Sequence, residues 1–109
     1  MRLEDLVPPL ELCKQLKPGE FEDSAMVWMT DGTCEPRRCS AYIAAPAPTL
    51  AEIMNEFRKN TKARWPVCEQ HPNGTWFCKV FDWDQGEGSI ADHNAATAAM
   101  RLYLEVRHD

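Results

Sequence analysis

Five cysteines and a neighbouring histidine are the residues of this chain best suited to bind a metal ion or to act as reactive thiols. Thiolates and imidazoles bind zinc when they converge tetrahedrally, most often from paired Cys-x-x-Cys turns. The sequence contains no such pair, because its cysteines are spaced more widely. A zinc-binding or thiol-dependent accessory protein is therefore an alternative interpretation, with candidate ligands Cys34, Cys39, Cys68, His71 and Cys78.

Residue spacing indicates neither a calcium loop nor a catalytic centre. The segment DWDQGEGSIADH resembles an EF-hand in Asp82 and Asp84. However, Glu87 stands where glycine is required, and His93 stands where the closing glutamate belongs. No nucleophile motif surrounds any cysteine. We therefore predict a polar connection here, and a protein that is not an enzyme and needs no cofactor.

The balance of charges argues against a nucleic-acid partner. The formal net charge is -5 and the pI is about 5.1, whereas phosphate binding draws its affinity from cationic contacts. One segment, RKNTKARW at 58–65, could form a local basic patch through Arg58, Lys59, Lys62 and Arg64 beside Trp65. Weak nucleic-acid binding through it is a further alternative, although cations also suit the last turn of a helix.

The first residues, MRLEDLVPPL, place acids where a secretory signal needs an apolar core, and the densest apolar run is too short to span a membrane. These features predict a cytoplasmic protein without a membrane partner. Thiols stay reduced in that compartment, and five cysteines cannot all be paired within one chain. We therefore expect free thiols.

The first half of the chain predicts a short helix followed by a hairpin. A helix is expected at 9–16, because prolines precede it and Pro18-Gly19 ends it. Residues 24–30, SAMVWMT, are apolar on both alternating faces and predict a central strand. Asp31-Gly32 is typical of a hairpin turn. Pro36 then marks an edge or the end of pairing, because proline cannot donate to a ladder.

Two amphipathic helices are expected further along. Thr49 and Glu52 have the spacing of a capping box. An apolar stripe follows at Leu50, Ile53, Met54 and Phe57. The closing helix begins at Asn94 or Asp92, and its apolar stripe is Ala95, Ala99, Leu102 and Val106.

The segment WPVCEQHPNGTWFCKVFDWD predicts a second hairpin around Asn73-Gly74. If those two residues form the loop, Cys78 lies opposite Glu69 and Cys68 lies opposite Lys79. Directly paired residues share a face and successive residues alternate, so the two cysteines would point to opposite sides of the sheet. This register disfavours a disulfide or a shared metal within the hairpin, unless a longer loop shifts it.

These elements predict a single α+β domain over residues 1–109, with one core. The expected order is α-ββ-α-ββ-α, with the two antiparallel hairpins forming a sheet that helices cover.

Three segments, PPLELCKQLKPGEFEDSAMVW, APTLAEIM and NAATAAMRLYL, resemble a group of short uncharacterised proteins encoded by bacteriophages and prophages of gut bacteria. The resemblance spans most of the chain and implies a phage-related context. Those proteins have no assigned activity, so it implies no catalytic residue.

Aromatic residues on both faces of the second hairpin are the strongest functional signal. Trp76 alternates with Phe77, Phe81 and Trp83, and helices can cover one face of a sheet while the other stays open. Large exposed apolar patches usually mark interfaces. We therefore expect a protein-protein interaction or assembly module that presents these four residues to an unknown protein partner or to a second copy of the chain.

Overall fold

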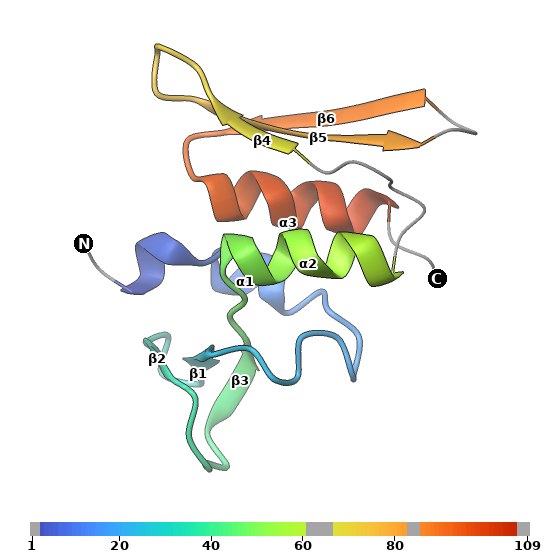
Figure 1. Cartoon of the computed structure of the whole chain (residues 1–109). Helices are drawn as coiled ribbons and strands as arrows, with labels where there is room; N and C mark the ends of the chain where they lie inside the picture. The colour runs from blue at the N-terminus through green and yellow to red at the C-terminus, as the bar shows by residue number, and fades with distance from the viewer. Residues whose placement is uncertain (1–2, 61–66, 83–85, 107–109) are drawn as a thin grey trace.

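The computed structural model describes residues 3–60, 67–82 and 86–106. In chain order, its elements are the 3-10 helix η1 (Leu3–Leu6), α1 (Leu10–Cys13), β1 (Met26–Met29), β2 (Cys34–Pro36), β3 (Ile43–Pro46), α2 (Leu50–Asn60), β4 (Val67–Gln70), β5 (Trp76–Asp82), β6 (Gly86–Asp92) and α3 (Ala95–Val106). They form three layers, in which α2 and α3 lie between a small sheet and a longer one (Figure 1).

The α+β class is confirmed, but the hairpins do not share one sheet. The small sheet has the order β2-β1-β3 and the long sheet has the order β4-β5-β6. All neighbouring strands in both sheets are antiparallel. Each predicted hairpin gains a third strand that the sequence did not predict, β3 in the first sheet and β6 in the second. The segment 86–92, expected as a polar connection, is therefore a strand.

β1 is the central strand of the small sheet, as its apolar residues predicted. All four of its residues are buried, and it pairs with β2 on one edge and β3 on the other. β2 is an edge strand that ends at Pro36, which is a position that tolerates the missing N–H group of proline.

The first hairpin turns through three residues rather than two. The N–H group of Met29 donates to the carbonyl of Thr33, and the N–H group of Gly32 donates to the carbonyl of Met29. Gly32 has a φ of 89°, which is the left-handed residue of a type I turn with a bulge. The Asp31 carboxylate accepts a hydrogen bond of 3.0 Å from the backbone N–H of Thr33 and so fixes the turn.

The second hairpin repeats this turn, and the predicted two-residue loop is wrong. The N–H of His71 donates to the carbonyl of Thr75, and the N–H of Gly74 donates to the carbonyl of His71. The loop is therefore Pro72, Asn73 and Gly74, in which Pro72 suits the first central position of a type I turn and Gly74 has a φ of 87°. The added residue shifts the register by one, so that Cys68 lies directly opposite Cys78.

The capping box of α2 is present and reaches beyond the helix. The Glu52 carboxylate accepts from the N–H of Thr49 at 2.9 Å, and the Thr49 hydroxyl accepts from the N–H of Glu52 at 3.4 Å. The second carboxylate oxygen of Glu52 accepts from the N–H of Ala25 at 3.1 Å. Glu52 therefore links the start of α2 to the entrance of β1.

α3 begins at Ala95 and is capped by Asn94, one of the two predicted caps. The side-chain carbonyl of Asn94 accepts from the N–H of Thr97 at 3.0 Å. Ala99 and Leu102 are fully buried as expected, and so are Ala98, Met100 and Tyr103. The small alanine side chains allow α3 to lie directly under β5 and β6 (Figure 1).

The described buried side chains form two clusters rather than one core. One cluster joins α2 and α3 to the long sheet and is centred on Tyr103, whose ring meets Phe21 and Phe57 edge-on at 5.2 and 5.7 Å. The other lies between the small sheet and the N-terminal segment. There, the Trp28 indole donates to the carbonyl of Pro8 at 3.0 Å. Across the described residues, no helix is long and apolar enough to span a membrane.

Both turn glycines can be tested by the same substitution. An added Cβ meets nothing within 4 Å at Gly32 or Gly74, so alanine there costs backbone energy and causes no clash. We expect Gly32→Ala and Gly74→Ala each to lower the free energy of unfolding by about 1 kcal/mol in urea denaturation. Asparagine, which tolerates positive φ, should cost less. An alanine variant as stable as the original protein would contradict the assigned turns.

Candidate interaction face

The observed register sorts the side chains of the second hairpin onto two faces. Paired residues share a face and successive residues alternate. Cys68, Gln70, Trp76 and Cys78 therefore belong to the inner face, which α3 covers. The outer face carries Val67, Glu69, His71, Phe77 and Lys79.

On the inner face, Cys68 and Cys78 form a disulfide, so the expectation of free thiols is wrong for this pair. The hydrogen bonds of the turn place them at a non-hydrogen-bonded position of the ladder, where opposite side chains approach most closely. Their Cα atoms are 4.2 Å apart. The Cys78 side chain is buried against the start of α3, with its sulfur 3.7 Å from the carbonyl oxygen of Ala95.

The outer face holds a small cluster of aromatic and charged groups. The rings of His71 and Phe77 are in contact, with centroids 4.1 Å apart and planes tilted by 43°. Glu69 Oε1 lies 3.1 Å from Lys79 Nζ and 3.4 Å from His71 Nε2. The pKa of the Glu69 carboxyl is lowered below its usual range, first by the hydrogen bond from Lys79, then by the positive charge of Lys79 and by a hydrogen bond from His71. The carboxylate therefore stays ionised and holds the cluster together.

This outer face is open to solvent in the described part of the molecule. Both long helices lie on the other side of the sheet (Figure 1). The side chains of Glu69, His71 and Lys79 are 48%, 43% and 40% exposed, and Val67 is 49% exposed. Phe77 is half-buried under the histidine ring. The cluster is thus accessible to another molecule.

Of the four aromatic residues predicted as an interface, the two whose side chains are described lie on opposite faces of the hairpin. Phe77 is on the outer face, whereas Trp76 is on the inner face. Trp76 lines a cavity of about 490 Å³ with Leu6, Leu50 and Ala96. The side chain of Phe81 and all of Trp83 lie outside the described residues. The sequence did not predict that Glu69 and Lys79 lie beside Phe77, because that placement depends on the hairpin register.

The candidate zinc ligands do not converge. Cys34 is buried in the small-sheet cluster, Cys39 is exposed, His71 is on the outer face, and Cys68 and Cys78 are bonded to each other. No group of three or more His, Cys, Asp or Glu side chains within the described ranges could hold a metal ion. In the calcium-like segment, Asp92 instead accepts hydrogen bonds from Asn94 and Arg101.

The predicted basic patch is described only in part. Arg58 and Lys59 lie in the last turn of α2 as expected. The Lys59 ammonium is 3.9 Å from the Glu56 carboxylate, an exposed pair. The side chain of Arg58, together with Lys62, Arg64 and Trp65, lies outside the described residues.

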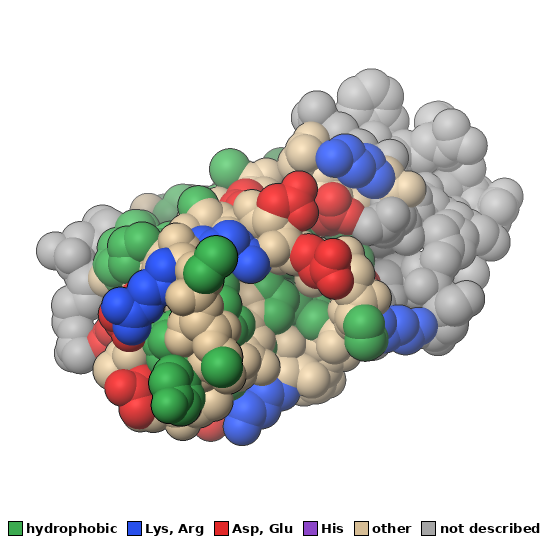
Figure 2. Space-filling view, turned by 90° about the horizontal axis from the view of Figure 1, so that it is seen from below, with side chains coloured by type: hydrophobic (Ala, Val, Ile, Leu, Met, Phe, Trp, Pro, Cys, Tyr) green, Lys and Arg blue, Asp and Glu red, His purple; other side chains and the backbone are tan. Residues whose placement is uncertain are grey.

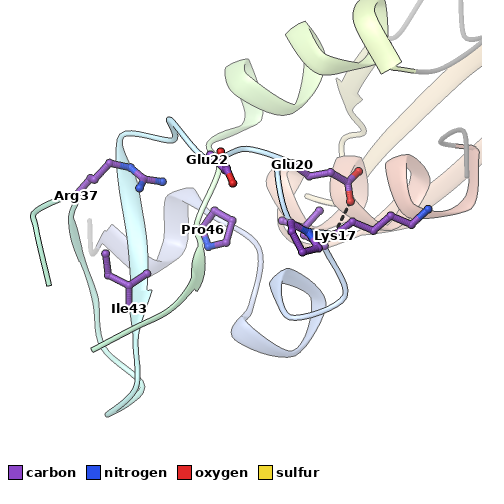
Figure 3. Close-up of a pocket in the computed structure, with 9 residues that line it drawn as sticks. Lys17, Glu20, Glu22, Arg37, Ile43 and Pro46 are labelled. Atoms are coloured by element: carbon purple, nitrogen blue, oxygen red, sulfur yellow. Dashed lines mark hydrogen bonds between the residues drawn. The ribbon is translucent and has the colours of Figure 1, made fainter. Parts of the chain in front are cut away.

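A second hollow, which the sequence did not indicate, lies on the opposite side of the molecule. The cavity is about 540 Å³, between the segment 16–22 and the small sheet, and this face mixes hydrophobic side chains with charges of both signs (Figure 2). Arg37 and Lys17 lie on opposite sides of it (Figure 3). The Arg37 guanidinium donates to the Ser24 carbonyl at 2.6 Å. The Glu20 carboxylate accepts from the backbone N–H of Lys17, also at 2.6 Å. The Arg37 guanidinium and the Glu20 carboxylate are therefore hydrogen-bonded to the protein's own backbone, and they do not point toward one common position in the cavity.

Scans against protein-family models, curated proteins and solved structures found no match to this chain. The resemblance to phage and prophage proteins therefore stays a prediction, and function must be argued from geometry.

The thiols give a direct test of the cysteine assignments. Burial raises the pKa of Cys13 to about 12 and also raises the pKa of Cys34, so both should resist alkylation in the folded protein at pH 8. In the native, unreduced protein, only Cys39 should be labelled. Unfolding without reduction should add Cys13 and Cys34. Unfolding with reduction should label all five cysteines. Mass mapping that finds Cys68 or Cys78 labelled before reduction would contradict the disulfide.

Proposed function

We propose that the protein is an interaction or assembly module that acts by contact and not by catalysis, and that its contact surface is the outer face of β4 and β5. The observation that carries this proposal is the open cluster of Val67, Glu69, His71, Phe77 and Lys79 on a sheet whose other face is covered by α3. An uncovered sheet face with apolar groups commonly marks a binding surface.

The charges of this face favour a second copy of the chain as the partner. Glu69 and Lys79 lie side by side, 3.1 Å apart. In a two-fold symmetric contact, residue i of one copy meets residue j of the other, and j meets i. The acid of each copy could therefore pair with the base of the other, while the Val67 and Phe77 side chains become buried between them.

The size of the face predicts weak association. Seven residues along β5 and two strands across correspond to roughly 23 by 10 Å, or on the order of 200 Å². A standard stable interface buries about 800 Å² on each partner. A contact made by this face alone should therefore need high protein concentration, unless the turn or a sheet edge adds area.

The phage or prophage context is part of the same proposal. It rests on the resemblance of the three segments.

The test is sedimentation velocity combined with native mass spectrometry over about 10 to 500 µM protein, a range chosen for weak interfaces. The oxidised protein should form a dimer at the upper end. Phe77→Lys should weaken dimerisation at least about tenfold, because it buries two charges at the centre of the contact. Tyr42→Lys, a change at a 69% exposed position beside the small sheet, is the control and should have no effect.

A charge swap tests the symmetric pairing. Lys79→Glu should weaken the dimer because it places acids against acids, and the double variant Glu69→Lys with Lys79→Glu should restore it. A protein that is monomeric at every concentration, or a Phe77→Lys variant that associates as well as Tyr42→Lys, would contradict the proposal.

A further inference from the structure

β4 contributes Val67 and Glu69 to the contact face and has few buried side chains of its own. Val67, Glu69 and Gln70 of β4 are exposed, and Cys68 is half-buried. β4 is also an edge strand, paired with β5 alone among the described strands. A segment with little buried apolar surface belongs to the low-stability end of a fold. Besides the backbone ladder, the disulfide and the Glu69–Lys79 ion pair link β4 to β5. The ion pair is exposed and contributes little stability, so the disulfide is the stronger of these two side-chain links.

We propose that the Cys68–Cys78 disulfide is a reversible redox switch that orders β4 and so assembles or dissolves the contact face. This inference rests on the proposed function for its consequence, although its structural part can be tested separately. In the oxidised chain, β4 and the residue that follows it, His71, place Val67, Glu69 and His71 beside Phe77 and Lys79. In the reduced chain, β4 separates from β5 and the cluster is lost.

The two sulfurs differ in access, which sets the direction of the exchange. Cys78 is 1% exposed beneath α3, whereas Cys68 is half-buried at the sheet edge. A thiolate of a dithiol reductant attacks Cys68 Sγ, the disulfide breaks, and the electron pair passes to Cys78 Sγ, which takes a proton. Its new S–H group can then donate to the Ala95 carbonyl, 3.7 Å away.

The second thiol of the reductant completes the reaction. It attacks the mixed disulfide on the reductant's own sulfur, so that Cys68 leaves as a thiolate and is protonated. In total, two electrons and two protons pass to the protein, and the dithiol becomes a disulfide. Oxidation by a disulfide of higher potential reverses the sequence.

The other cysteines do not take part. Cys13 and Cys34 are buried in the small-sheet cluster, and Cys39 is exposed on the loop that follows β2. Cys39→Ser is therefore a matched control that removes a thiol but leaves the switch intact.

The experiment is amide hydrogen exchange on the full chain, read by NMR, with the oxidised protein, the protein reduced by dithiothreitol, and the Cys68→Ser, Cys78→Ser double variant. The amides of Val67, Glu69 and His71 should exchange at least about tenfold faster in the reduced protein and in the variant, because losing a native disulfide commonly shifts an opening equilibrium by more than a factor of ten. The amides of β1 should be unchanged, reoxidation should restore protection, and Cys39→Ser should respond like the original protein.

Two results would overturn the switch. One is equal protection of β4 in the oxidised and reduced chains. The other is loss of protection in β1 as well, which would mean that reduction unfolds the whole domain. Sedimentation of the same samples separates the two proposals: an oxidised protein that never dimerises contradicts the contact face, whereas an ordered β4 after reduction contradicts the switch.

Discussion

The register of the second hairpin is the constraint on which the candidate site depends. Because side chains alternate along a strand, a shift of one residue would move every side chain of β4 to the other face. The three-residue turn at Pro72, Asn73 and Gly74 sets this register through two backbone hydrogen bonds. It places both cysteines inside, where they can be joined, and places the Glu69 and Phe77 side chains together outside. The disulfide and the contact cluster are thus two consequences of one turn.

The helix layer gives this hairpin a firm base. α3 can approach the sheet closely because its buried side chains include small alanines at 96, 98 and 99. Tyr103 packs against Phe57 of α2 and Phe21 of the N-terminal segment. The Tyr103 hydroxyl donates to the Glu20 carboxylate, which ties in the loop before β1. One face of the long sheet is therefore covered by α3, and both long helices lie on that same side.

Local signals in the sequence predicted the elements that depend on neighbours along the chain. The Thr49 and Glu52 box, the Asn94 cap and the buried run of β1 were all found where expected. β6 was not predicted, because Gly86 and Gly88 are typical of a loop and this strand exists only through pairing with distant β5. The separation into two sheets is likewise a matter of long-range packing. The disulfide was missed because Asn73-Gly74 suits two turn types, and Pro72 favours the longer one.

A nuclear Overhauser experiment on the oxidised protein tests the register most directly. Opposite residues at a non-hydrogen-bonded position bring their Hα atoms closest, and the Cα atoms of Cys68 and Cys78 are 4.2 Å apart. The account predicts strong Hα–Hα contacts between Cys68 and Cys78 and between Gln70 and Trp76. A strong Hα–Hα contact between Glu69 and Cys78, or between Cys68 and Lys79, would show the two-residue turn instead and would contradict both the inner disulfide and the outer cluster.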